Sequence, residues 1–171
     1  MRDAHNQVAA TFSDWLRDYG GIPVKIARSF ASNPEDQRDL LQEMYLQLWR
    51  SIESFAAQAK ASTWTYRVCL NTAMTWQRTE KRRHRFLNSA DLADLYVPPD
   101  GCANATLLDA LYSSIRELRP VDRALILLYL EERSYREIGE IIGISESNTG
   151  VRLQRIKREL AERLKTYPVA L

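Results

Sequence analysis

The sequence predicts an all-α protein made of two small helical domains joined by a flexible linker. Apolar residues recur at spacings of three and four along most of the 171-residue chain, which is the period of an amphipathic helix. Strand-like alternation of apolar and polar residues is absent from the sequence. Between Phe86 and Asn104 the helical period disappears, and the run PPDG at residues 98–101 excludes a continuous helix there because proline lacks the N–H group that a helix needs.

That interruption sets the domain boundaries. We expect a first domain at residues 1–86, a linker at residues 87–104 and a second domain at residues 105–171. The chain has 45% hydrophobic and 27% charged residues, a balance typical of globular proteins. Its net charge of +2 is too small to indicate nucleic-acid binding by itself.

Several classes of function are disfavoured by what the sequence lacks. No apolar run approaches the roughly 20 residues of a membrane span, and the polar start MRDAHNQ is unlike a signal peptide, so we expect a cytoplasmic protein without a membrane segment. Cys69 and Cys102 are isolated, which predicts free thiols rather than a zinc site or disulfide. His5 and His84 lie in polar surroundings, and no phosphate loop or catalytic triad is present. We therefore expect no metal, cofactor, small-molecule substrate or enzymatic activity.

The first domain begins with two helices that we interpret as structural. The first is expected over residues 8–19, and the second starts at Pro23 and ends at Phe30. Asn33 can cap a third helix that has Pro34 in its first turn. The expected core stripe of this third helix is Leu41, Met44, Tyr45, Leu48 and Ile52.

One face of the third helix surrounds an exposed leucine with acidic and amide side chains. Single exposed leucines are common, so an ordinary surface is one interpretation. A patch that docks on another protein is the other interpretation. The face consists of Asp39, Gln42, Glu43, Leu46 and Arg50.

A loop over residues 54–62 precedes the fourth helix, which Ser62 or Thr63 is expected to cap. One face of this helix mixes aromatic, amide and basic side chains. Single-stranded DNA requires such a mixture, because rings stack on bases, amides contact base edges and cations bind phosphates. A solvated helix end, with Trp64 in the core, is the alternative. The face carries Trp64, Arg67, Asn71, Trp76, Gln77, Arg78, Lys81 and Arg82, and the apolar line opposite is Tyr66, Leu70, Ala73 and Met74.

The second domain is expected to open with two apolar helices. The first aligns Leu107, Leu108, Leu111, Ile115 and Leu118, and Pro120 stops it. The second follows in the run VDRALILLYLEE.

Residues 134–165 then show a helix-turn-helix pattern. Ser134 and Glu137 form a capping box, Gly143 can end the first helix in a left-handed conformation, and Ser145 can cap the second helix. Such a capped helix with a polar and basic start suits the major groove of DNA, although an ordinary helical hairpin shows a similar pattern. The buried residues of the second helix are expected to be Thr149, Leu153, Ile156, Leu160 and Leu164, and its outward residues Glu146, Ser147, Asn148, Arg152, Arg155, Lys157 and Arg158.

Two positions of that second helix are unusual. Gly150 costs about 1 kcal/mol relative to alanine inside a helix, which suggests a close approach to a phosphate or a poorly optimised surface position. Val151 lies off the buried stripe, where it can contact a thymine methyl group or pack on the other helix.

These segments together resemble the two conserved regions of the extracytoplasmic-function (ECF) sigma factors. The resemblance lies in the run DLLQEMYLQLWR at residues 39–50, in residues 64–71 and in residues 118–160, and it covers most of the chain. It implies a non-catalytic subunit that directs bacterial RNA polymerase core to promoter DNA. Such factors are commonly held by an anti-sigma factor, so we expect one as a further partner.

The resemblance also implies roles for particular residues. Asp39, Gln42 and Glu43, with Leu46 beside them, match the surface that docks on polymerase. The second helix of the helix-turn-helix matches the part that contacts the minus-thirty-five element. The residues expected at the melted minus-ten element are Ser62, Thr63, Trp64, Arg67, Asn71, Gln77, Arg78, Lys81 and Arg82, and those at the minus-thirty-five element are Ser145, Ser147, Asn148, Val151, Arg152, Arg155 and Arg158.

The chain departs from the family pattern at two places. The family usually has the run TVKSRL where this chain has NTGVRL at residues 148–153, and an Asp-Arg pair where this chain has TWQR at residues 75–78. The promoter sequence therefore does not follow from the chain. The main alternative is a conventional helix-turn-helix regulator of duplex DNA, although a repressor has no need for both the acidic face of the third helix and the aromatic-basic face of the fourth.

Overall fold

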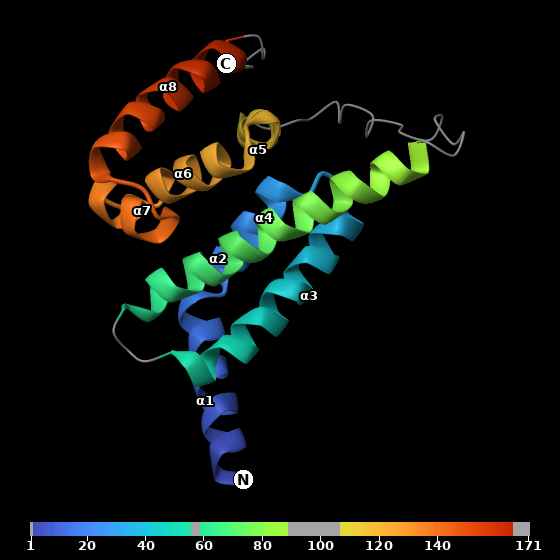
Figure 1. Ribbon diagram of the computed structural model, residues 1–171, viewed down its shortest axis with the longest axis vertical. Coiled ribbons are helices and arrows are strands. Elements are labelled where there is room, and N and C mark those ends of the chain that lie inside the picture. The colour runs from blue at the N-terminus through green and yellow to red at the C-terminus, as the bar shows by residue number, and fades with distance from the viewer. Residues whose placement is uncertain (1, 56–58, 89–106, 166–171) are drawn as a thin grey trace.

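The computed structural model describes residues 2–55, 59–88 and 107–165, and these form helices connected by short turns (Figure 1). In the described residues the all-α prediction is confirmed. The helices are α1 (Arg2–Tyr19), α2 (Gly21–Phe30), α3 (Pro34–Ser51), η1 (Ile52–Ser54), α4 (Ala61–Asn88), α5 (Leu107–Glu117), α6 (Pro120–Leu130), α7 (Tyr135–Ile142) and α8 (Glu146–Leu164).

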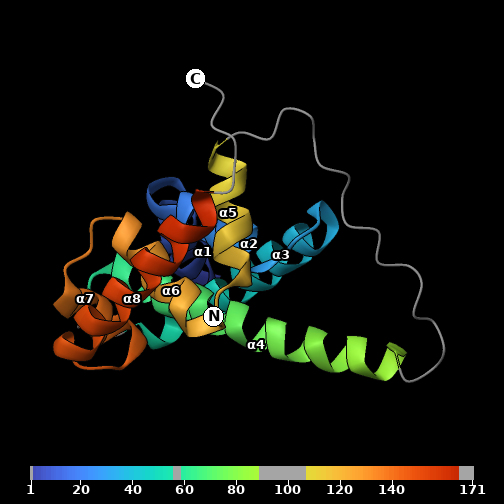
Figure 2. The same cartoon turned by 90° about the horizontal axis from the view of Figure 1, so that it is seen from above.

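Helices α1 to α4 form the N-terminal part, in which α4 packs against both α2 and α3. The predicted cap of α3 is confirmed, since Asn33 Oδ1 accepts a hydrogen bond from the Asp36 backbone N–H at 2.7 Å. The last turns of α4 extend beyond the other helices (Figure 2). Leu87 and Asn88 belong to α4 rather than to the expected linker, and residues 89–104 of that linker lie outside the described residues.

The buried stripe of α3 differs from the predicted one. Leu40, Met44 and Leu48 are buried, whereas Leu41, together with Tyr45 and Ile52 of the predicted stripe, is only half-buried. The start of α4 also differs, because the helix begins at Ala61 and Ser62 and Thr63 lie inside its first turn instead of capping it.

Buried in α4, Cys69 is a free thiol, as predicted, and it is in contact with the core. Burial raises its pKa to about 12 because the thiolate would lose its hydration. Cys102 lies outside the described residues.

Helices α5 to α8 form the C-terminal part. Ile115 and Leu118 are buried as expected, but Leu107 and Leu108 are 59% and 51% exposed. They occupy the first turn of α5, in which Asp109 and Ala110 rather than these leucines lie against the rest of the protein, so extending the apolar stripe to them was wrong. Pro120 takes the first position of α6, where its missing N–H is not needed.

The helix-turn-helix of α7 and α8 forms through the predicted local signals. The capping box of Ser134 and Glu137 is present, and its hydrogen bonds lower the pKa of the Glu137 carboxyl group. Gly143 ends α7 with φ of 82°, and Ser145 Oγ accepts from the Asn148 backbone N–H at 3.2 Å. Gly139 permits the tight turn, because a Cβ atom there would lie 2.6 Å from the Ile144 carbonyl oxygen.

The two parts of the chain pack against each other. Helix α2 contacts α5 and α6, and α4 contacts α6 and α7. Lys25 of α2 forms an ion pair with Glu131, and Arg28 pairs with Asp109 while lying 4.4 Å from the Tyr112 ring centroid. These side chains connect α2 to the second half of the chain, and because they are partly exposed, each ion pair stabilises the contact by only a small amount.

Arg123 of α6 is the most deeply buried cation in this contact. Its Nε donates to the Leu118 carbonyl oxygen at 2.8 Å, and its guanidinium also donates to the Arg116 carbonyl and lies 5.4 Å from the Phe30 ring centroid. When the Gln77 amide is oriented with its oxygen toward Arg123, this oxygen accepts hydrogen bonds from both terminal nitrogens of Arg123, at 2.7 and 3.1 Å. Burial, with Arg116 acting in the same direction, lowers the pKa of Arg123 to about 10, so the group stays charged at neutral pH.

Leu40 is expected to contribute far more to stability than its neighbour Leu41. Leu40 is fully buried, so Leu40→Ala should lower the free energy of unfolding by about 2–5 kcal/mol. Leu41→Ala should cost about 1 kcal/mol, because much of that side chain already contacts water. Urea denaturation followed by circular dichroism measures both, and equal losses would contradict the placement of the stripe.

Replacing Arg123 by methionine should loosen the contact between the two parts of the chain. The Leu118, Arg116 and Gln77 oxygens would lose their donor, at a cost of about 1–3 kcal/mol. Hydrogen exchange should therefore rise in α2 and around Gln77, as well as in α6. The exposed Arg158 provides the control, since Arg158→Met should leave this exchange unchanged. Faster exchange confined to α6 would show that Arg123 does not link the two parts.

Candidate protein and nucleic-acid interfaces

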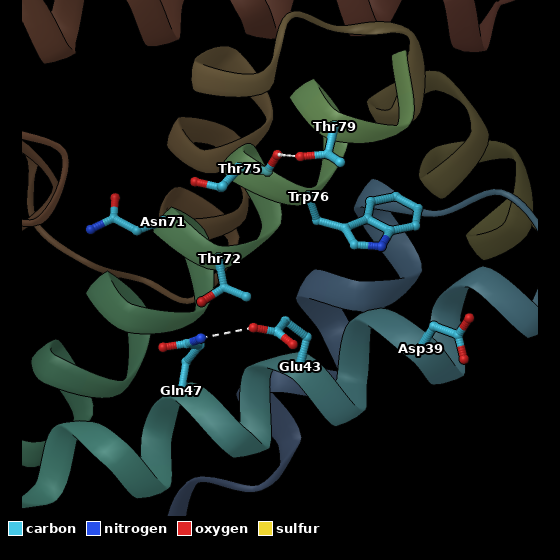
Figure 3. Close-up of a pocket in the computed structure, with 8 residues that line it drawn as sticks. All are labelled: Asp39, Glu43, Gln47, Asn71, Thr72, Thr75, Trp76 and Thr79. Atoms are coloured by element: carbon cyan, nitrogen blue, oxygen red, sulfur yellow. Dashed lines mark hydrogen bonds between the residues drawn. The ribbon is translucent and has the colours of Figure 1, made fainter. Parts of the chain in front are cut away.

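A groove between α3 and α4 brings together residues from two of the predicted sites (Figure 3). Glu43 accepts a hydrogen bond from Gln47 Nε2 at 2.7 Å, and the half-buried Trp76 ring extends from α4 toward α3. Asn71, predicted for DNA, lines the same groove as Asp39 and Glu43, predicted for polymerase. The lining residues are Asp39, Glu43, Gln47, Asn71, Thr72, Thr75, Trp76 and Thr79.

The acidic face of α3 is accessible as predicted. Asp39 and Gln42 are exposed, Leu46 is 43% exposed, and Glu43 is half-buried beside the groove. A surface with two carboxylates, an exposed leucine and a neighbouring indole ring suits a partner with basic and apolar side chains.

Residues at the start of α4 have structural contacts. Ser62, Thr63 and Trp64 are half-buried. Trp64 Nε1 donates to Ser51 Oγ at 3.0 Å, and its ring packs edge-on against Phe55 with 5.6 Å between centroids. Trp64 therefore packs on the core, which is the alternative that the sequence left open.

Further along α4, the predicted DNA residues divide into three groups. Arg67, Asn71 and Arg78 are exposed, and Arg67 Nη2 donates to the Glu140 carbonyl oxygen of α7 at 2.9 Å. Gln77 is buried against Arg123, so the expectation of an outward Gln77 is wrong in this arrangement of the two halves. The side chains of Lys81 and Arg82 lie outside the described part of the structure.

The second helix of the helix-turn-helix, α8, has the predicted buried stripe. Thr149, Leu153, Ile156 and Leu160 are buried, and Leu164 is half-buried. Directly opposite lie Ser147, Val151, Gln154 and Arg158, all exposed, with Val151 67% exposed. Ser145 and Asn148 are also exposed at the helix start. Gln154 was missed by the sequence analysis, although a spacing of three or four from Val151 and Arg158 places it on this face.

Gly150 of α8 lies beside the ring of Tyr135 on the neighbouring helix α7. A Cβ atom at this position would lie 3.4 Å from the Tyr135 ring of α7. This is close to an ordinary van der Waals distance, so the Tyr135 ring alone does not require a glycine here. Lys157, expected to point outward, is half-buried and lies 4.6 Å from the centroid of the Tyr129 ring.

Arg152 and Arg155 both contact Asp122 of α6, which the sequence analysis did not single out. Arg152 donates to Asp122 Oδ1 from Nε at 3.2 Å and from Nη2 at 2.7 Å. Arg155 Nη2 lies 3.4 Å from Oδ2, and Arg119 donates to the same oxygen at 2.9 Å. Asp122 itself is 4% exposed. The prediction that Arg152 is simply outward is therefore wrong, because a buried carboxylate from another helix binds it.

The described residues contain neither a candidate metal site nor a helix that could span a membrane. Among these residues, no three His, Cys, Asp or Glu side chains are grouped so as to hold a metal ion. Within the same ranges, no helix has the length and apolar character needed to cross a membrane.

Comparison with known proteins identifies a family for each half of the chain. Residues 15–83 match the family model of sigma-70 region 2, and residues 108–160 match that of sigma-70 region 4. The ECF RNA polymerase sigma factor SigW of Bacillus subtilis is 26% identical over 168 residues, covering 90% of this chain and 89% of that protein. The ECF RNA polymerase sigma-E factor of Haemophilus influenzae is 28% identical over 139 residues, covering 74% and 73%.

Solved structures show the same fold. The sigma factor RpoE of Bartonella quintana, in complex with the anti-sigma factor NepR, aligns with a TM-score of 0.67 at 18% identity over 98% of this chain and 100% of that chain. CnrH, in complex with the cytosolic domain of CnrY, aligns with a TM-score of 0.65 at 19% identity over 95% and 96%. Since both sigma-70 regions occur on one chain and the relatives match along most of their length, the chain belongs to the ECF sigma factors of RNA polymerase.

Proposed function

We propose that this chain is an alternative sigma factor that binds RNA polymerase core and directs promoter recognition and DNA melting. The observation that carries the proposal is the presence of regions 2 and 4 on one chain, each with its own accessible surface. A conventional repressor has no use for the acidic face of α3, so nothing favours the alternative of a duplex-binding regulator. Catalysis is expected to belong to the polymerase, and the cytoplasm is the expected location.

The acidic face of α3 is the proposed polymerase-docking surface. Asp39, Gln42, Glu43 and Leu46 lie along this side of the helix, and Asp39, Gln42 and Leu46 are exposed. Charged residues at such a surface guide the encounter with polymerase, and Leu46 supplies an apolar contact in the complex. An anti-sigma factor is a further proposed partner, by analogy with the solved complex of RpoE with NepR.

The two DNA elements are assigned to different parts of the chain. Region 2 is proposed to hold the melted minus-ten element through Arg67, Asn71 and Arg78, with aromatic and hydroxyl groups nearby, because capture of an unstacked base needs stacking and phosphate contacts. Region 4 is proposed to contact the minus-thirty-five duplex through the exposed start and outer face of α8.

Transcription from a promoter library tests the proposal directly. Purified bacterial core polymerase, with and without the chain, is supplied with fragments whose minus-ten and minus-thirty-five segments are randomised. Abortive products from defined start sites should require the chain, and the selected fragments should reveal its promoter motif. Duplex binding without initiation, even with polymerase from the source organism, would favour the regulator instead.

Removing the two carboxylates of α3 should weaken the binding of core polymerase. Asp39→Ala with Glu43→Ala should raise the free energy of binding by about 2 kcal/mol or more, as expected for interface hot spots. Neither residue is buried, so the thermal unfolding midpoint should change little. Asp14→Ala is the matched control, because Asp14 is an exposed carboxylate on a different helix, α1, and its loss should leave the binding of core polymerase unchanged. An unchanged affinity in the double variant would remove the docking assignment.

A further inference from the structure

We infer that Asp122 is a positioning residue for recognition of the minus-thirty-five element. It holds Arg152 as a fixed link between α6 and α8, and it restricts where the Arg155 guanidinium can lie. This inference rests on the function proposed above for region 4.

The three arginines around Asp122 are bound unequally. Arg152 makes both of its hydrogen bonds to Oδ1, and its side chain is only 24% exposed. Arg155 lies at the outer limit of hydrogen bonding, 3.4 Å from Oδ2, and its side chain is 58% exposed. Arg119, 67% exposed, shares Oδ2 with Arg155. A single weak contact leaves most of the exposed Arg155 guanidinium available to DNA while Asp122 stays beside it, whereas taking up Arg152 would leave a buried carboxylate without its closest partner.

Other nearby carboxylates do not compete for Arg155. Glu117 and Glu159 line the same hollow as Asp122 and Arg155, but both bind Arg163 of α8. The single carboxylate of Asp122 thus faces three cations, and the cluster keeps a positive excess at the side of α8. Phosphates attract such an excess on any sequence, so what Asp122 adds is a restriction on where the Arg155 guanidinium can lie.

That restriction is the physical basis for base selectivity. Arginine distinguishes guanine through two hydrogen bonds in the major groove, which require a fixed orientation of the guanidinium plane. An arginine without a carboxylate beside it is free to bind a phosphate instead. Asp122 is expected to disfavour this by holding the guanidinium beside α6, at the side of α8.

The experiment uses the full chain in complex with core polymerase and the randomised promoter library. In Asp122→Asn the amide keeps the shape of the side chain but loses its charge. Base preference at one or two minus-thirty-five positions, with guanine as the expected preferred base, should fall about fivefold or more. Arg155→Gln should lower preference at the same positions, and the preferences at the minus-ten element should stay as in the wild type.

Two further measurements separate positioning from a merely structural role. Competition by a duplex with a scrambled minus-thirty-five element should become about two- to threefold stronger in Asp122→Asn, since the cluster gains one positive charge. The double variant with Arg155→Gln should lose no more preference than Arg155→Gln alone, because the two residues act together. Arg158→Gln is the matched control, since Arg158 has no contact with Asp122 and its effect should add to that of Asp122→Asn.

The outcomes are distinguishable even if Asp122→Asn folds less well. Base preference is a ratio measured within active complexes, so a smaller folded fraction lowers total product without changing it. Unchanged minus-thirty-five preference, or a uniform loss on all sequences, would overturn the inference while leaving the sigma-factor proposal intact. Absence of initiation with the wild-type chain would instead overturn the proposed function itself.

Discussion

The arrangement of the two halves of this protein depends on the buried guanidinium of Arg123. It binds the carbonyl groups at the end of α5, faces the amide of Gln77 in α4 and lies over Phe30 of α2. A buried cation is tolerated only where acceptors hold it in place. One side chain of α6 therefore links α2, α4 and α5, which come from different parts of the sequence. The peripheral ion pairs of Lys25 and Arg28 add a smaller contribution at the edge of this contact.

Features that depend on neighbouring residues were predictable from the sequence. The caps at Asn33, Ser134 and Ser145 and the left-handed Gly143 need only a few residues to form, so their local pattern was sufficient. The register of the α3 core was not predictable in the same way. Leu40 and Leu41 are adjacent, and the packing of α3 against α2 and α4 decides which of them is buried.

The candidate DNA-binding surface of α8 shows the same difference between local features, which were predictable, and contacts between helices, which were not. Helical spacing identified the exposed Val151 and Arg158 of α8, and it was sufficient to find Gln154 as well. It did not place Asp122 beside Arg152, because these residues are thirty positions apart and on different helices. The neighbour of Gly150 is likewise Tyr135 from α7. Periodicity describes one helix at a time, whereas contacts between helices are set by how they cross.

The hydrogen bond from Arg67 to the Glu140 carbonyl joins a proposed DNA-binding residue of region 2 to the first helix of the helix-turn-helix. The contact holds the Arg67 guanidinium against α7, while its other N–H groups can still donate elsewhere. A partner that drew Arg67 away from α7 would break this contact, and by thermodynamic reciprocity the packed arrangement would then weaken the binding of that partner by the same factor. The DNA contact proposed for Arg67 would then depend on the position of region 4, although no residue of α7 need contact that DNA.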